Sequence, residues 1–179
     1  MAEEIVYVPV PGCEMWNLYA TREGNLYRKR SYANGTEKFR KIGSKHHSGY
    51  IQFRVRTNGT KLEGLVHILI ARTFITNPDE KPCVDHINNY RSDNRVENLR
   101  WCTRQENTHN SKKHRDCSSN YKGVSWFKSM NKWRARIYVN KKEKHLGLFD
   151  DEIEAAHAYD KYARKHYGEF AKLNFPDNK

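Results

Sequence analysis

An aspartate and a histidine stand side by side at Asp85 and His86, within the stretch VDHINNYRSDNRVENLRWCTRQENTHN at 84–110. These residue types suit the hydrolysis of phosphodiester bonds. A neutral imidazole, with an unperturbed pKa of about 6.5, can take a proton from water at physiological pH. A carboxylate and an amide oxygen, from Asp85 and Asn107, are hard ligands that suit Mg²⁺. Two protein ligands would leave room around the octahedral ion for phosphate oxygens and water.

The sequence predicts the elements that must position these residues. The sequence predicts a strand at residues 84–87, then a loop rich in Asn, Asp and Ser, then a second strand. Thr103, with Glu106 three residues later, forms a capping box, so we expect a helix to begin there, with Asn107 near its first turn. Such a strand–loop–strand–helix unit could aim the strand's Asp-His pair and Asn107 at one point.

This stretch resembles the HNH endonucleases, in particular the homing-endonuclease branch found in phages and mobile introns. The resemblance implies a ββα-metal motif in which Asp85 binds the metal and His86 is the general base. It also implies that Asn98 fixes the intervening loop and that Asn107 completes the metal site. Asn107 stands where the family often has histidine, which favours Mg²⁺, or Mn²⁺ as a substitute, over Zn²⁺. Products with 5′-phosphate and 3′-hydroxyl ends are implied as well.

Upstream of this motif, apolar residues recur at helical spacing, which predicts a helix over residues 62–75 that ends before Asn77-Pro78. His67 falls off the apolar stripe, so we interpret it as a surface or boundary histidine. The HNH resemblance extends upstream through this helix, and more weakly over the strands that precede it.

Residues 1–61 are typical of short strands separated by turns such as Asn34-Gly35 and Asn58-Gly59. Between residues 50 and 56, apolar side chains alternate with polar ones, which predicts a half-buried strand with a basic outer face that carries Arg54 and Arg56. From residue 22 to residue 61 there are eleven Lys or Arg and two Glu. We expect this region to face DNA.

Residues 118–179 predict three strands at about 121–127, 132–139 and 142–149, then a helix over 151–167 with Asp151 as its cap. Residues 118–149 hold eight Lys or Arg and one Glu, so the charge lies on the sheet rather than on the helix. This pattern favours a sheet that faces nucleic acid and a helix that supports it.

The same segment resembles the ethylene-response-factor (apetala-two) DNA-binding domain of plant transcription factors, through YKGV at 121–124, LGLF at 146–149 and LNFP at 173–176. The resemblance implies that the sheet reads duplex DNA. Positions where plant members place base-reading arginines hold other residues here, so the plant target sequence does not carry over. The candidate DNA contacts are Lys122, Lys132, Arg134, Arg136, Lys142 and Lys144.

Composition agrees with a nucleic-acid partner. The 179 residues carry a net charge of +12, and 12% of them are aromatic, which favours a folded basic protein over a disordered tail. No apolar run is long enough for a membrane span, and the start is not typical of a secretory signal, so we expect an intracellular location, in host cytoplasm, nucleoid or nucleus. A zinc site of Cys102, His109, His114 and Cys117 matches no common ligand spacing.

The sequence therefore predicts an α+β fold. It has a basic β-rich region (1–61), an HNH core (62–110, with the ββα-metal motif at 83–110), a basic linker (111–117) and an ethylene-response-factor-like domain (118–179). We expect a site-specific homing endonuclease that cuts double-stranded DNA with one divalent metal ion, as a monomer with no obligate protein partner. The alternatives are a DNA-binding regulator whose HNH unit is only a scaffold and, with less support, an RNA-processing nuclease.

Overall fold

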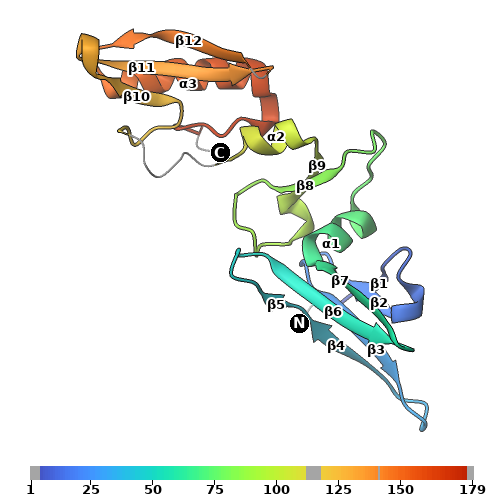
Figure 1. Cartoon of the computed structure of the whole chain (residues 1–179). Coiled ribbons are helices and arrows are strands. Elements are labelled where there is room, and N and C mark those ends of the chain that lie inside the picture. The colour runs from blue at the N-terminus through green and yellow to red at the C-terminus, as the bar shows by residue number, and fades with distance from the viewer. Residues whose placement is uncertain (1–4, 112–117, 141, 177–179) are drawn as a thin grey trace. The chain divides into compact units, whose positions relative to one another are not determined.

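The computed structural model describes residues 5–111, 118–140 and 142–176 (Figure 1). It has the expected α+β fold and divides into two compact units, an N-terminal unit (Met1–Arg104) and a C-terminal unit (Gln105–Lys179). Most of the linker expected at 111–117, with His114 and Cys117 of the zinc alternative, lies outside the described residues. Within the described part of the chain, no group of three His, Cys, Asp or Glu side chains could hold a metal ion. No helix there is long and apolar enough to cross a membrane.

Two antiparallel sheets build most of the N-terminal unit. The first has strands β1 (Val8–Pro9), β2 (Leu18–Ala20), β3 (Leu26–Ser31) and β4 (Glu37–Ile42), with the 3-10 turn η1 (Glu14–Trp16) between the first two. The second has strands β5 (Ser44–Lys45), β6 (Ile51–Thr57) and β7 (Thr60–Leu65). The predicted alternation on β6 is confirmed, because Phe53 and Val55 are each 5% exposed.

The helix expected over 62–75 is shorter, because α1 spans Val66–Phe74. Residues 60–65 instead form β7 and pair with β6, with Leu62 opposite Val55. The turn between the two strands has positive φ at Asn58 and Gly59, a conformation that suits a tight hairpin. Two leucines of the helical pattern therefore belong to a strand, because cross-strand pairing outweighs their spacing.

The predicted strand–loop–strand–helix order is present. Strand β8 (Cys83–His86) pairs antiparallel with β9 (Leu99–Cys102), and the loop between them contains the 3-10 turn η2 (Val96–Asn98). Helix α1 packs against both strands. Helix α2 (Arg104–His109) follows directly after Thr103, and its residues from Gln105 onward belong to the C-terminal unit.

The C-terminal unit has the predicted three-stranded antiparallel sheet and one packing helix (Figure 1). The strands are β10 (Val124–Phe127), β11 (Lys132–Val139) and β12 (Lys142–Phe149), with η3 (Lys128–Met130) after β10. Helix α3 (Glu152–Tyr167) packs against the sheet and is followed by η4 (Gly168–Phe170). The predicted cap is confirmed, since the Asp151 side chain accepts hydrogen bonds from the backbone N–H groups of Ile153 and Glu154.

Candidate active site

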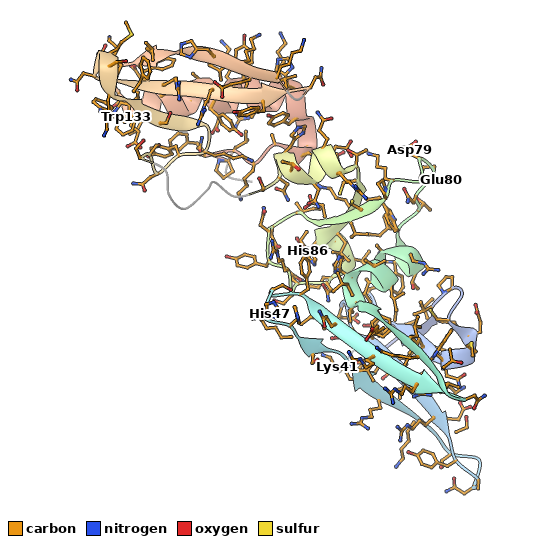
Figure 2. All side chains as sticks on the ribbon, in the orientation of Figure 1. Lys41, His47, Asp79, Glu80, His86 and Trp133 are labelled. Carbon is orange, nitrogen blue, oxygen red and sulfur yellow. The ribbon has the colours of Figure 1, made fainter. Side chains whose placement is uncertain are left out.

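His86 ends strand β8 and is 5% exposed (Figure 2). Its Nε2 lies 3.0 Å from Oδ1 of Asn94. Because an amide oxygen only accepts hydrogen bonds, Nε2 carries the proton and Nδ1 holds the lone pair. Burial lowers the pKa of His86, although the bond to Asn94 acts in the opposite direction. The imidazole is therefore neutral at physiological pH, which is the form that can accept a proton.

Asp85, one residue earlier, is also 5% exposed and is held from the neighbouring strand. Arg100 stands directly opposite it on β9. The guanidinium of Arg100 donates from Nε and Nη2 to Oδ2 of Asp85, at 3.0 and 2.8 Å. Burying a carboxylate is costly without such a partner. The strand pair therefore holds a carboxylate oxygen beside His86.

Asn98 links both sides of the loop between β8 and β9. Its Oδ1 accepts a hydrogen bond from the backbone N–H of Asn88 at 3.0 Å, and its Nδ2 donates to the carbonyl oxygen of Asp93 at 2.7 Å. Its own carbonyl oxygen accepts from the N–H of Ile87 at 2.9 Å. Asn98 therefore joins residues 87, 88 and 93 of the loop by hydrogen bonds, and its role in fixing the loop for catalysis stays a prediction.

The turn between β2 and β3 packs against the same loop, at Asn94. Gly24 has φ +81°, and a Cβ atom there would lie 2.2 Å from the backbone carbon of Asn94. The carbonyl oxygen of Arg22 accepts a hydrogen bond from the N–H of Val96 at 3.0 Å. Because only glycine allows this approach, the N-terminal sheet helps to place the partner of His86. No signal in the sequence indicated this contact.

His67 is not a surface histidine, and that interpretation was wrong. It is 4% exposed, and its ring centroid lies 4.8 Å from that of His86 and 5.2 Å from that of Tyr50. Its Nδ1 has no hydrogen-bond partner among the described residues. Helix α1 contacts both β6 and β9, so it buries a wider face than the apolar stripe alone. The helical hydrophobic pattern therefore failed to identify a buried histidine beside the candidate general base.

Burial also lowers the pKa of His67 from 6.5 to about 3, with a smaller contribution from His86. Since the folded-state pKa lies below the unfolded-state value, the unfolded chain binds more protons between these values, and the free energy of unfolding rises with pH across that window. One such group adds a slope of up to about 1.4 kcal/mol per pH unit. We expect His67→Phe to lower the slope of unfolding free energy against pH for the N-terminal unit by this amount. Urea denaturation from about pH 4 to about pH 7 measures it.

The matched control is His47→Phe, because His47 is exposed in the same unit. His67→Phe is expected to lower the slope of unfolding free energy against pH by more than this control does. Equal slopes for His67→Phe and the wild type would show that His67 takes up its proton in the folded state.

Asn107 lies on α2 in the C-terminal unit, whereas Asp85, His86 and Asn98 lie together in the N-terminal unit. The described contacts therefore bring together three of the four residues expected to act in catalysis. The donor set itself fits Mg²⁺, since this ion is commonly held by one or two protein oxygen ligands and otherwise by phosphate oxygens and water. The predicted ligands, a carboxylate oxygen of Asp85 and an amide oxygen of Asn107, are of this kind.

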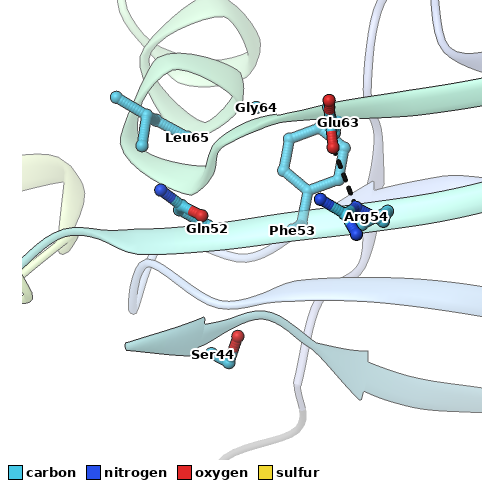
Figure 3. Close-up of a pocket in the computed structure, with 7 residues that line it drawn as sticks. All are labelled: Ser44, Gln52, Phe53, Arg54, Glu63, Gly64 and Leu65. Atoms are coloured by element: carbon cyan, nitrogen blue, oxygen red, sulfur yellow. Dashed lines mark hydrogen bonds and ion pairs between the residues drawn. The ribbon is translucent and has the colours of Figure 1, made fainter. Parts of the chain in front are cut away.

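The candidate DNA contacts on the second N-terminal sheet differ in their surroundings. Arg54 donates from Nε to Oε2 of Glu63 at 2.8 Å, beside a pocket over β6 and β7 (Figure 3). Lys61 binds the other oxygen of Glu63 at 2.8 Å. Arg56, opposite Lys61 in the register, is exposed. Exposed ion pairs of this kind are weak, so a phosphate could replace Glu63 as the partner of Arg54.

On the C-terminal sheet, Lys132, Arg134 and Arg136 follow the face of β11 opposite the buried Ala135 and Ile137. Lys142 and Lys144 on β12 stand opposite Val139 and Ile137, so they lie on the face that packs against α3. Lys132 and Arg136 form exposed pairs with Asp150 and Glu143, each at 2.9 Å. The guanidinium of Arg134 lies 5.3 Å from the ring centre of Phe127, and the ammonium of Lys144 lies 4.7 Å from that of Tyr162; Lys142 is exposed.

Lys122 differs from the other DNA-contact candidates. Its ammonium donates to the carbonyl oxygens of His109 and Ser111, at 2.6 and 2.7 Å. Burial lowers its pKa to about 8. The side chain is therefore already occupied within the C-terminal unit, which argues against the expected contact with DNA.

Replacing Arg134 and Arg136 together by glutamine is expected to weaken DNA binding and to flatten its salt dependence. Each lost phosphate contact reduces the slope of log affinity against log salt by about 0.9. We therefore expect a loss of about 1.8 in slope, measured by fluorescence anisotropy over a salt series. The control replaces Lys161 and Lys165, exposed on α3, by glutamine, so that the same charge is lost away from the sheet. An equal change in both double variants would show a general charge effect.

Comparison with known families gives two matches along the chain. Residues 65–109 match the HNH endonuclease family, and residues 119–169 match the AP2 domain family. The chain therefore carries an HNH endonuclease domain followed by an AP2 domain. The first match contains Asp85, His86, Asn98 and Asn107, and the second contains β10, β11, β12 and α3.

Relatives of each part are also found. Over 91 residues (51% of this chain and 26% of the relative), it is 32% identical to "Uncharacterized HNH endonuclease L245" of Acanthamoeba polyphaga mimivirus. Over 60 residues (32% and 22%), it is 43% identical to "Dehydration-responsive element-binding protein 2A" of Oryza sativa subsp. indica. The chain thus spans about a quarter of the length of these relatives. The structure "DNA binding and cleavage by the HNH homing endonuclease I-HmuI" gives a TM-score of 0.47 at 22% identity, over 59% of this chain and 56% of that one.

Proposed function

We propose that this protein is a site-specific DNA endonuclease of the homing type that hydrolyses phosphodiester bonds of double-stranded DNA. The observation that carries the proposal is a buried, neutral His86 held by Asn94 beside the Asp85 carboxyl group, which Arg100 holds. This pairs a general base with a hard metal ligand on one strand, within an HNH endonuclease domain. The cofactor would be a single Mg²⁺, with Mn²⁺ as a substitute.

The chemistry follows from the state of His86. Its Nδ1 lone pair takes a proton from a water molecule, and the water oxygen attacks the phosphorus. Asn94 holds Nε2–H and so keeps the ring in the tautomer and orientation that this step needs. Asp85 and Asn107 would hold the metal ion, which when bound supplies positive charge to stabilise the phosphorane and the leaving oxygen. Bond cleavage on the 3′-oxygen side leaves 5′-phosphate and 3′-hydroxyl ends.

DNA would be held along both units by basic faces. In the C-terminal unit, Lys132, Arg134 and Arg136 follow one face of β11, and a sheet can enter the major groove, where base edges are distinguishable. In the N-terminal unit, Arg54 and Arg56 extend the phosphate contacts. Two linked binding units gain affinity through effective concentration, so one chain could act alone as a monomer.

The rival function is a DNA-binding regulator in which the HNH domain is only a scaffold. Both proposals predict tight binding to DNA, so binding alone does not separate them. We would incubate the protein with pooled genomic DNA in Mg²⁺, Mn²⁺ or EDTA and sequence the ends produced. The nuclease predicts metal-dependent breaks concentrated at a few sequences, with 5′-phosphates. Tight binding without breaks in either metal would favour the regulator.

A further inference from the structure

Helix α2 is too short to be stable on its own. It has six residues, Arg104–His109, and none of them is buried. Isolated helices shorter than about 12–15 residues are marginal in water, because nucleation is costly. The position of Asn107 on this helix therefore depends on what holds the helix. In the C-terminal unit, two side chains of the AP2 domain do so.

The first is Lys122, two residues before β10. Its Nζ donates to the carbonyl oxygen of His109, the last residue of α2, and to that of Ser111, two residues further on. The last carbonyl groups of a helix have no partner inside the helix, and a cation there is also favoured by the helix dipole. One ammonium group therefore satisfies two carbonyls where the helix would otherwise fray.

The backbone that carries Lys122 is itself fixed. Its N–H donates to Oδ1 of Asn174 at 2.7 Å, and its carbonyl oxygen accepts from Nδ2 of Asn174 at 3.1 Å. The N–H of Asn174 in turn donates to Oδ1 of the buried Asp160 on α3, at 2.9 Å. The ammonium of Lys122 is thus anchored to the core of the AP2 domain.

The second side chain is Tyr167, at the end of α3. Its ring stacks on that of His109, with centroids 3.6 Å apart and planes at 13°. Its hydroxyl donates to the carbonyl oxygen of Tyr138 on β11, at 2.5 Å. The ring is therefore held by the sheet while it covers the last residue of α2.

We propose that Lys122 and Tyr167 are positioning residues of the nuclease: they clamp the end of α2 within the C-terminal unit and so keep Asn107 on an ordered helix. The claim for Asn107 rests on the proposed function, whereas the clamp itself does not. Lys122 then serves the cleavage site rather than the DNA-reading face. The AP2 domain would be a structural part of the catalytic apparatus as well as a DNA-binding module.

Hydrogen exchange tests the clamp in the full-length protein without metal or DNA. Lys122→Met keeps the aliphatic stem and removes the charge; the control is Lys128→Met, an exposed lysine of the same domain. We expect amides of residues 105–111 to exchange at least about tenfold faster in Lys122→Met and unchanged in Lys128→Met, with α3 protected in both. Unchanged exchange of α2 in a folded Lys122→Met protein would overturn the clamp.

His109→Ala tests the clamp a second time without changing any residue of the AP2 domain. It removes the ring on which Tyr167 stacks, from the side of α2. Faster exchange confined to residues 105–111 is again the expected result. If neither Lys122→Met nor His109→Ala changes that exchange, the contacts do not hold the helix and the inference is wrong.

DNA binding and cleavage then test the consequence. We expect Lys122→Met to keep the wild-type affinity and salt slope but to cut about tenfold more slowly and to need more Mg²⁺ for half-maximal rate. Wild-type cleavage with a destabilised α2 would overturn the placement of Asn107. A salt slope lower by about 0.9 with unchanged exchange would make Lys122 a phosphate contact and overturn the proposal. A wild-type protein that cuts no DNA would refute the proposed function and the claim for Asn107. The hydrogen-exchange result would still show whether the clamp exists.

Discussion

Replacing His86 by alanine will slow metal-dependent DNA cleavage by about 10²–10⁴-fold, the usual contribution of a general base. The reason is that the Nε2 of His86 is fixed by Asn94 and the pKa of its ring is lowered by burial, so a neutral imidazole stands beside Asp85 ready to accept a proton. The loss should fall on the single-turnover rate, measured with the enzyme in excess over DNA. DNA affinity, measured by anisotropy without metal, should remain at the wild-type value.

The matched control for this variant is His47→Ala, an exposed histidine of the same unit (Figure 2). It should cleave at the wild-type rate. Circular dichroism of His86→Ala must match the wild type, since the ring also packs against His67 at 4.8 Å. A folded His86→Ala protein that cleaves within about threefold of the wild-type rate would remove His86 from the mechanism.

Replacing Arg100 by methionine will lower the free energy of unfolding of the N-terminal unit by about 3–5 kcal/mol. Asp85 and Arg100 form a buried pair, with side chains 5% and 13% exposed. The Asp85 carboxylate would lose both hydrogen bonds from the guanidinium while staying desolvated. Urea denaturation near neutral pH measures the change.

The double variant Asp85→Asn/Arg100→Met separates the lost partner from the lost packing. It removes the buried charge as well as its counter-charge, so it should be more stable than Arg100→Met alone by at least about 1 kcal/mol. A loss below about 1 kcal/mol in Arg100→Met would mean that water or another group solvates Asp85, and the pair would then not be what keeps the ligand charged.

Local signals predicted much of the fold. The hairpin turn at Asn58-Gly59, the capping aspartate Asp151 and the alternation on β11 depend on neighbouring residues, and the structure contains each of them. The α+β architecture and the order of the HNH and AP2 domains followed from such motifs. The pattern failed at residues 62–65, where pairing with β6 outweighed helical spacing.

The candidate site was predicted less completely, because its geometry depends on contacts between distant segments. The adjacent Asp85 and His86 could be found from residue types and spacing, and the loop-linking Asn98 from the resemblance to the HNH endonucleases. The partners could not: Arg100 lies opposite Asp85 only once β8 and β9 pair, and Asn94 reaches His86 only through the folded loop. Arg100 could have been identified in advance by assuming that β8 and β9 pair without a register shift, which puts it opposite Asp85.

The prediction for Lys122 was limited in the same way, because its contacts also come from distant segments. A lysine in a basic segment of a DNA-binding domain is reasonably predicted to contact phosphate. Its use by the carbonyl oxygens of His109 and Ser111 depends on how α2 packs in the C-terminal unit. Nothing in the local sequence around Lys122 encodes that contact.

The most direct test of the central claim is a time course of supercoiled plasmid carrying the preferred site, with wild-type protein in Mg²⁺ and in EDTA. We predict nicked or linear DNA in Mg²⁺, intact plasmid in EDTA, and product ends that carry 5′-phosphate and 3′-hydroxyl groups. Plasmid that is bound in both conditions and cut in neither, with Mn²⁺ also inactive, would contradict the endonuclease and leave a DNA-binding protein.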